Sequence, residues 1–286
     1  MSEKVPNPRD TAMPNPPGTA VPNPRDTGVP VRPEGRTAGA RMKLSSEPSG
    51  VSFMKMDDAR GRNIFSPEFI AEFLQALDVL EQERRTKALV LSGLTDVFCG
   101  GAEKQALLDL CEGKAAVRDL VICERLLDVP FPVIAAMEGH AIGGGLAVAF
   151  CCDIVIAARE SRYGAVFMSL GFTPGMGCTT LLADLVGPFL ANEMMYTGKR
   201  FRGSELEGKG TNINYILPRA EVMGRARDIA EQIAEKDGRS LGLLKHALGV
   251  RKKKLLVDAR LQEDLMHRIS FSFPETRQTI LERYPD

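Results

Sequence analysis

Short apolar runs alternate with longer amphipathic stretches from about residue 51 onward, and this pattern predicts an α/β protein. Four apolar runs, each bounded by polar residues, glycine or proline, are typical of buried strands: 51–56, 88–92, 133–137 and 154–157. Segments with helical spacing separate them. Strands that alternate with helices form βαβ units, so we expect one mostly parallel sheet.

The helices are predicted from the spacing of their apolar residues. Ser66 followed by Pro67 marks the start of the first helix, which continues to about residue 84. Its apolar face holds Phe69, Phe73, Leu77 and Leu80. Beyond about residue 187 the chain is predicted to be largely helical, with helices over 220–236 and 240–256 and a final one around 261–269.

Residues 1–48 differ in composition from the rest of the chain. An eight-residue repeat rich in proline occupies 5–12, 13–20 and 21–28, and no aromatic residue occurs before residue 53. Because proline at this density prevents regular helices and central strands, we predict a disordered or polyproline-like tail over 1–48. The folded domain then covers 49–286, with C-terminal helices from about residue 220. Two roles are open for the tail: a docking tether for a large assembly, or a passive extension.

Composition narrows the possible function classes. The formal net charge is zero at pH 7, and 44% of the residues are hydrophobic, which argues for a large core and against a nucleic-acid or anionic-membrane binder. The sequence shows no signal peptide and no apolar run long enough to span a bilayer. The six cysteines form no C-x-x-C motif and no metal-ligand spacing with the three histidines. We therefore expect a reduced, cytoplasmic protein without a metal site.

The stretch 132–152 carries the strongest chemical signal. Gly143, Gly144 and Gly145 follow the predicted strand 133–137 and open an apolar helix. The first turn of a helix has unpaired N–H groups and a partial positive charge, and glycine lets a ligand oxygen approach them closely. Three interpretations stay open at this point: a tight turn, a phosphate cradle, and a site for a carbonyl oxygen that becomes negative during a reaction.

Several motifs together make the chain resemble the enoyl-CoA hydratase/isomerase (crotonase) superfamily over residues 50–286. The motifs are Ala-Leu-Val-Leu-Ser-Gly at 88–93, Phe-Cys-Gly-Gly-Ala at 98–102, the 132–152 stretch, Asp-Ile-Val-Ile-Ala-Ala at 153–158 and Gly-Phe-Thr-Pro-Gly-Met-Gly at 171–177. The resemblance implies a spiral of ββα units and a C-terminal helical region that drives trimerisation.

The same resemblance implies an oxyanion hole made of two backbone N–H groups. Carried onto this sequence, the donors are Ala102, which follows Gly101, and Gly144, which follows Gly143. They hold a thioester oxygen and stabilise an enolate, and each such donor contributes roughly 3 kcal/mol to lowering the barrier. The implied substrate is carried as a thioester on CoA or phosphopantetheine, and no metal or dissociable redox cofactor is implied.

The sequence departs from the hydratases of the superfamily at the two positions where they carry glutamates. Ala147 and Phe167 occupy these positions in the expected substrate pocket, which also includes Gly101 and Gly143. Neither can carry a proton, and hydration requires a titratable group at the reacting atom. The motif at 167–179, supported by 202–208 and 265–267, resembles instead the decarboxylating members of polyketide β-branching cassettes. Those enzymes convert 3-methylglutaconyl on an acyl carrier protein to the 3-methylcrotonyl thioester and carbon dioxide. An apolar pocket favours the loss of a carboxylate as an uncharged product.

Resemblance to that subgroup implies a catalytic histidine near the C-terminus and a lysine in the helix after the first oxyanion loop. The histidine matches His267, and His246 is a competing candidate. For the lysine, Lys114 is the first candidate and Lys104 the second. A lysine pairs with the substrate carboxylate, and a histidine near its ordinary pKa donates a proton.

Three further residues have structural explanations. His140 precedes the glycine run and is expected to support that loop. Arg202 is expected to cap a helix. Cys178 opens a predicted helix, where a thiol can be acidified, but we expect it to pack in the core.

Two alternatives to the decarboxylase stay open. One is a hydratase or isomerase that acts on a CoA thioester with a different acid. The other is a non-catalytic trimer kept as a scaffold within a synthase assembly. We expect an acyl carrier protein or a CoA thioester as partner, a homotrimer or dimer of trimers, and neither nucleic acid nor a membrane as partner.

Overall fold

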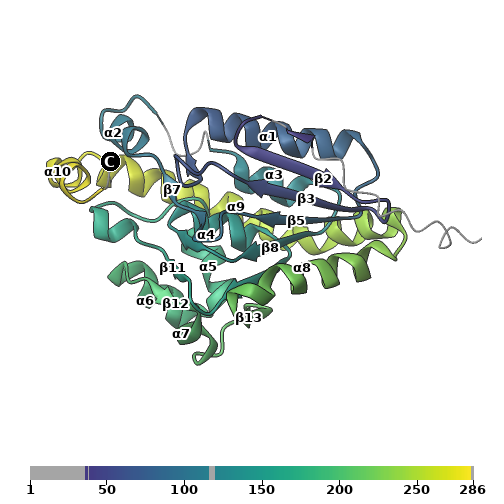
Figure 1. The fold of residues 1–286 in the computed structure, drawn as a ribbon. Helices are drawn as coiled ribbons and strands as arrows, with labels where there is room; N and C mark the ends of the chain where they lie inside the picture. Colours follow the sequence, from purple (N-terminus) through teal and green to yellow (C-terminus); the bar gives the residue numbers. More distant parts are fainter. Residues whose placement is uncertain (1–35, 38, 116–119, 285–286) are drawn as a thin grey trace, which may run out of the picture. The chain divides into compact units, whose positions relative to one another are not determined.

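A computed structural model describes residues 36–37, 39–115 and 120–284 and confirms the predicted α/β class. Its largest sheet has seven strands in the order β1-β2-β3-β5-β8-β10-β13 (Figure 1). The strands from β3 to β13 pair in parallel, and β1 and β2 extend one edge in antiparallel orientation. Their bounds are β1 Arg36–Thr37, β2 Met42–Ser46, β3 Val51–Met56, β5 Ala88–Ser92, β8 Val133–Met137, β10 Ile154–Ala158 and β13 Tyr215–Leu217.

Short strands form two smaller sheets beside the large one. The four-stranded sheet has the order β12-β11-β9-β6, and a two-stranded sheet joins β4 to β7. Their bounds are β4 Ile64–Phe65, β6 Val97–Cys99, β7 Gly101–Ala102, β9 His140–Ile142, β11 Arg162–Gly164 and β12 Phe201–Arg202. Successive turns of the chain give one strand to the large sheet, one to the four-stranded sheet and then a helix, as in β8, β9 and α4. This winding confirms the predicted ββα spiral.

Helices cover both faces of the large sheet (Figure 1). The first begins where the sequence predicts, because the Ser66 hydroxyl accepts a hydrogen bond from the N–H of Phe69 and Pro67 follows it. The helices are α1 Pro67–Gln82, α2 Lys104–Cys111, α3 Ile122–Asp128, α4 Gly144–Cys151, the 3₁₀ helix η3 Phe167–Leu170, α5 Cys178–Val186, α6 Pro188–Thr197, α7 Gly203–Glu207, α8 Arg219–Ala234, α9 Gly238–Ser270 and α10 Pro274–Arg283.

The strands of the large sheet are apolar on both faces because both faces are covered. Along β5, Leu89 and Leu91 belong to the core that includes α1, whereas Ala88 and Val90 pack with α8. This alternation follows from the two-residue repeat of a strand. A continuous apolar run is therefore the correct signature for a sheet buried on both sides.

The predicted boundary between tail and domain at residue 48 is wrong. Met42 and Leu44 are buried in strand β2, which pairs with β3 from Met42↔Met56 to Ser46↔Ser52. The sequence lacks aromatic residues here, but alternating Met and Leu side chains suffice to fill the core face of a strand. Residues 1–35, which hold the octad repeats, lie outside the described residues.

The predicted break after residue 256 is also absent. One helix, α9, continues from Gly238 to Ser270, and a further helix, α10, follows it. In the second half of α9 the buried residues are Leu256, Ala259, Glu263, His267 and Ser270. Because polar side chains occupy part of this stripe, the apolar pattern looks interrupted although the spacing stays helical. The continuous helix is what carries His267 to its place.

Within the described residues, no helix is both long and apolar enough to cross a membrane. The expected cytoplasmic location stays a prediction.

Candidate active site

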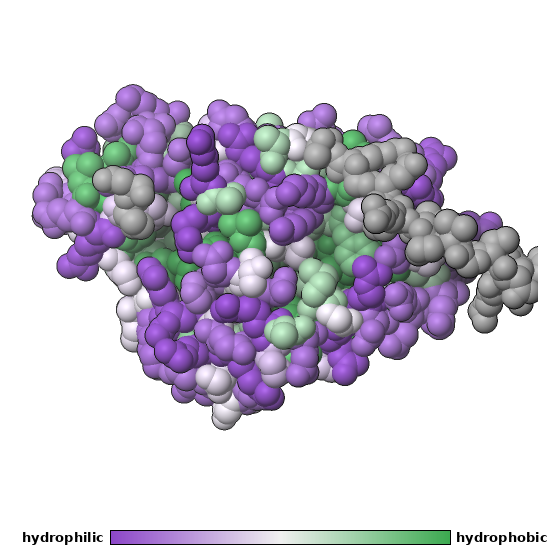
Figure 2. Space-filling model, viewed as in Figure 1, coloured by the Kyte–Doolittle hydropathy of each residue, from purple (hydrophilic) through white to green (hydrophobic). Residues whose placement is uncertain are grey.

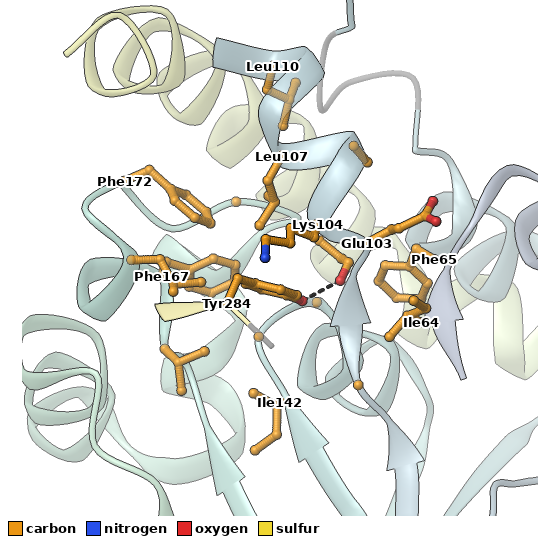
Figure 3. Close-up of a pocket in the computed structure, with 18 of the residues that line it drawn as sticks. Ile64, Phe65, Glu103, Lys104, Leu107, Leu110, Ile142, Phe167, Phe172 and Tyr284 are labelled. Atoms are coloured by element: carbon orange, nitrogen blue, oxygen red, sulfur yellow. Dashed lines mark hydrogen bonds between the residues drawn. The ribbon is translucent and has the colours of Figure 1, made fainter. Parts of the chain in front are cut away.

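A cavity of about 1220 Å³ lies where β4, β7, α2, the start of α4, η3 and the C-terminal helices meet. Figure 2 shows apolar surface gathered in a hollow beside α2 and the chain end, with hydrophilic residues around it. Figure 3 shows aromatic and aliphatic side chains pointing into this space from several elements. A mostly apolar cavity with a few polar groups is the usual form of a small-molecule site.

The first turn of α4 faces the cavity. Gly143 and Gly144 line it, and Gly144 is the first residue of the helix. Gly143 has φ +56° and donates its own N–H to the Gly164 carbonyl, 2.8 Å away. The N–H groups of the first helical turn have no intrahelical acceptor, so the turn can bind an oxygen that gains negative charge.

Glycine is required where the other wall approaches α4. A Cβ on Gly101, which has φ +90°, would lie 2.7 Å from the Ile142 carbonyl oxygen and 3.4 Å from the Gly144 nitrogen. A Cβ on Gly145 would lie within 3.0 Å of the Cys99 carbonyl oxygen, closer than real Cβ atoms approach. The backbone that leads into Ala102 therefore packs directly on the start of α4, and Ala102 and Gly144 both line the cavity. Both predicted oxyanion donors therefore border the same space, and their role as donors stays a prediction.

The far end of α4 is held by a lysine from α9. Lys252 donates to the carbonyl oxygens of Phe150 at 3.0 Å and Cys152 at 2.7 Å. A cation at a helix C-terminus stabilises the helix dipole. This contact fixes α4, and with it the position of Gly144.

The two positions where hydratases carry glutamates differ in their surroundings. Phe167 lines the cavity in an edge-to-face contact with Phe172, whose ring stacks on Phe271 with centroids 4.6 Å apart. Ala147 is fully buried in the core and is not among the lining residues, so its predicted place in the pocket is wrong. Gly101 is likewise not among the lining residues, so its predicted place in the pocket is wrong, whereas Gly143 does line the pocket. Neither Ala147 nor Phe167 offers a titratable group.

His267 lines the cavity from α9. Its Nε2 lies 2.9 Å from the Thr173 carbonyl oxygen, so Nε2–H donates to that oxygen, and its ring lies 5.5 Å from that of Phe271. Burial lowers the pKa of His267 below its ordinary value, which favours the neutral ring. Phe271 caps the end of α9 four positions after His267, a spacing that brings the two rings to the same side.

The two lysine candidates differ in whether they line the cavity. Lys114 is exposed, its amine lies 2.6 Å from the Glu112 carboxylate, and it is not among the lining residues, so the structure does not support it as the pocket lysine. Lys104 is the lysine that lines the cavity within the described part of the chain, and Figure 3 shows it pointing toward Phe172 and Tyr284. The reason is that Lys104 opens α2 two residues after Ala102, whereas Lys114 lies beyond the helix end.

The other predicted residues are now placed. His246 is exposed on α9 and away from the cavity lining. His140 Nδ1 accepts the N–H of Arg162 at 2.9 Å, which ties β9 to β11; His140 also lines the cavity, so its purely supporting role stays a prediction. Arg202 precedes α7 and its N–H donates to Glu205, which confirms a capping position. Cys178 is buried, and burial raises the pKa of its thiol well above the ordinary value, which confirms packing.

The charged residues of the lining are mostly cationic. Within the described part of the chain, Glu103 is the one carboxylate of the lining. Figure 3 shows the Glu103 side chain pointing toward Phe65, on the opposite side of the α2 start from the Lys104 amine. The cationic residues are Arg60, Arg62, Lys104, Arg200 and Arg283. This excess of positive charge favours an anionic ligand.

No cluster of three or more His, Cys, Asp or Glu that suits a metal ion occurs among the described residues.

Sequence reasoning missed Tyr284. It lines the cavity from the chain end, and its hydroxyl donates to the Ala102 carbonyl oxygen, as the dashed line in Figure 3 marks. No sequence signal pointed to it, because the contact joins residues 182 positions apart.

Comparison with known proteins agrees with this geometry. The sequence model of the enoyl-CoA hydratase/isomerase family matches residues 46–284. The chain belongs to this family, the crotonase superfamily. It is 37% identical to the bacillaene synthase decarboxylase PksI of Bacillus subtilis over 239 residues. This matched region covers 84% of this chain and 96% of that protein.

Solved structures give the same grouping. A chain from a dehydratase/decarboxylase enzyme couple involved in polyketide β-branching superimposes with a TM-score of 0.83 at 36% identity, covering 85% of this chain and 96% of that one. The ECH2 decarboxylase domain of CurF from Lyngbya majuscula superimposes with a TM-score of 0.82 at 32% identity, covering 86% and 100%. The predicted resemblance to the decarboxylating members of the crotonase superfamily is confirmed.

Proposed function

We propose that the cavity binds a 3-methylglutaconyl group as its thioester on the phosphopantetheine arm of an acyl carrier protein and releases its free carboxylate as carbon dioxide. The chain is a crotonase-family decarboxylase related to enzymes of polyketide β-branching. One observation carries the finer proposal: the start of α4 and Ala102 meet in a cavity whose wall holds Phe167 and Lys104. The site thus combines N–H donors that can bind a negatively charged oxygen, a cationic side chain and an apolar wall.

Binding uses the charge of the cavity. Lys104 pairs with the free carboxylate of the acyl group, and the arginines of the lining favour the phosphodiester of the phosphopantetheine arm. The thioester oxygen lies between the N–H groups of Ala102 and Gly144. Phe167 and Phe172 exclude water around the carboxylate, and this loss of hydration favours an uncharged product.

The chemical step moves negative charge from one end of the acyl group to the other. The bond from the γ carbon to the carboxylate carbon breaks, and its electron pair enters the conjugated system and reaches the thioester oxygen. The Ala102 and Gly144 N–H groups stabilise the resulting dienolate. A proton delivered to the γ carbon then gives the 3-methylcrotonyl thioester.

His267 delivers that proton. Because Nε2–H is engaged by the Thr173 carbonyl, the donating proton is carried by Nδ1 of the imidazolium form. Burial lowers the pKa of His267, and the anionic substrate opposes this by stabilising the charged ring. His267 therefore takes up its proton as the substrate binds.

Intact-mass spectrometry of the loaded carrier protein tests this function. The expected result is loss of the mass of carbon dioxide from the 3-methylglutaconyl carrier, with a slower reaction on the same acyl group attached to CoA. Gain of the mass of water would support a hydratase instead, and an unchanged carrier with folded enzyme would support the scaffold alternative. His267→Gln is expected to slow the reaction, and Tyr196→Phe, at an exposed residue on α6, is the control.

We also infer that α9 is covered by other copies of the chain in a homotrimer. Its outer face carries an exposed apolar stripe, with side chains 54–76% exposed, formed by Leu243, Val250, Val257, Leu261, Leu265 and Ile269. Their spacing of four and seven keeps them on one face of the helix, and a stripe of this length is unusual on a monomer surface. Light scattering of the purified protein is expected to give three copies, and Leu261→Lys with Leu265→Lys to give fewer. A monomeric wild-type protein would contradict the inference.

A further inference from the structure

The C-terminal helix is joined to both walls of the cavity. On one side the Thr276 hydroxyl lies 2.7 Å from the Gly171 carbonyl oxygen, directly after η3, which carries Phe167. On the other side Tyr284, directly after α10, donates its hydroxyl to the Ala102 carbonyl oxygen. The chain end therefore bridges the aromatic wall and the oxyanion wall.

Short elements flank the Ala102 backbone. It ends β7, a strand of two residues that pairs with β4 through Phe65↔Ala102. Glu103 follows at the N-cap of α2 without a side-chain hydrogen bond to the helix, and within α2 Leu107 is the buried residue. Because the first turn of α2 lacks a side-chain cap, a further hydrogen bond to the backbone just before it adds to its support.

The Tyr284 hydroxyl suits the task of fixing this backbone. The side chain is largely buried, and burial raises its pKa to about 12, so the hydroxyl stays protonated and a donor at every working pH. Its ring also lines the cavity beside the Lys104 side chain (Figure 3). One side chain thus touches the substrate space and anchors the residue that carries an oxyanion donor.

We propose that Tyr284 is a positioning residue of the oxyanion hole, which acts through its hydrogen bond to the Ala102 carbonyl. The inference rests on the proposed function in that Ala102 must bind the thioester oxygen. The bond fixes the peptide that joins Ala102 to Glu103. Through the Cα that the two peptides share, it restrains the preceding peptide, which carries the Ala102 N–H, in the orientation that the dienolate oxygen requires. Without it, the acyl group still binds, but the donor is misaligned when charge develops.

The polarisation of a bound carbonyl measures this alignment without any turnover. The probe is the 3-methylcrotonyl thioester of pantetheine with a ¹³C label in the thioester carbonyl, bound to the enzyme and followed by infrared difference spectroscopy. In wild type the carbonyl stretch is expected at lower frequency than in water. Tyr284→Phe, which removes one oxygen atom and keeps the ring, is expected to lose much of that shift. Tyr196→Phe and His267→Gln are expected to keep it.

Kinetics give a second readout that loss of stability alone would not produce. For Tyr284→Phe we expect kcat to fall about tenfold with KM nearly unchanged, since the bond matters most when the oxygen is charged. Thr276→Val removes the hydroxyl that bonds to the Gly171 carbonyl at the other end of α10. It is expected to reduce both the carbonyl frequency shift and kcat, by a smaller amount than Tyr284→Phe. Circular dichroism of each variant verifies folding.

The outcomes separate the two proposals. A folded Tyr284→Phe protein with the wild-type carbonyl shift and the wild-type kcat would overturn the positioning role. Absence of any shift in wild type would overturn the oxyanion hole itself, and with it both proposals. A shift that depends on Tyr284 in an enzyme that does not decarboxylate would support the positioning role and refute the proposed reaction.

Discussion

Lys104 and Lys114 offer a matched test, because they lie ten positions apart on one segment and only the first lines the cavity. The perturbation is Lys104→Gln, with Lys114→Gln as control. A hydrogen bond to a charged group contributes about 1.5–3 kcal/mol. At about 1.4 kcal/mol per factor of ten, its loss weakens binding of the carboxylate about 10- to 100-fold.

The effect is expected in KM rather than in kcat. Lys104 pairs with the carboxylate in the bound substrate and keeps this contact while the bond to the γ carbon breaks. An interaction that is about equally strong in the ground state and in the transition state contributes to binding and does not accelerate the step. Lys104→Gln should therefore raise KM and keep kcat within a few-fold of wild type. Lys114→Gln should change neither, because its amine pairs with Glu112 outside the cavity.

Steady-state kinetics on the 3-methylglutaconyl carrier, with carbon dioxide release as the signal, measures both constants. Binding of the 3-methylcrotonyl carrier, which lacks the carboxylate, supplies an internal reference and should be equal in wild type and Lys104→Gln. A large fall in kcat for Lys104→Gln would show that the lysine moves a proton, against this reasoning. A larger effect of Lys114→Gln than of Lys104→Gln would refute the assignment.

Three further predictions follow from single contacts. Gly145→Ala places a Cβ against the Cys99 carbonyl, so we expect a lower thermal midpoint and about 100-fold lower kcat; wild-type values for both would refute the close packing. Phe167→Glu introduces a carboxylate into the aromatic cluster, and we expect a raised KM because it repels the substrate carboxylate; an unchanged KM would contradict that placement. Since burial lowers the pKa of His267, kcat/KM should fall as pH rises through a value below 6.5, and a His267→Gln profile that still shows this fall would assign it to another group.

The elements that the sequence predicted well are those whose signal is local. The four apolar strands and the first helix appear as expected because each carries its own pattern and boundary residues, such as Ser66 before Pro67. Gly144 opens α4 as predicted, because Gly143 before it adopts φ +56°, a conformation that glycine reaches without strain. These signals act over fewer than about ten residues, which is the range of local propensity.

The features that sequence reasoning missed depend on contacts between distant segments. Strand β2 is stabilised by pairing with β3 and has no strong pattern of its own. The choice between Lys104 and Lys114 depends on where α2 starts, and helix boundaries are the least certain part of such predictions. Tyr284 reaches Ala102 only because α10 folds back across the cavity. The continuity of α9 was missed because Glu263 and His267 are polar residues on its buried face. Their hydrogen-bond partners lie on other segments of the chain, so the local sequence does not show that they are buried.

The most direct test of the account follows the carboxylate itself. The measurement is ¹³C NMR of a 3-methylglutaconyl carrier labelled in its free carboxylate, recorded with the enzyme in D₂O. The account predicts that the label leaves as carbon dioxide and bicarbonate in equal amount to the 3-methylcrotonyl thioester formed, with one deuteron at the γ carbon. Retention of the label in a hydrated or isomerised thioester would contradict it.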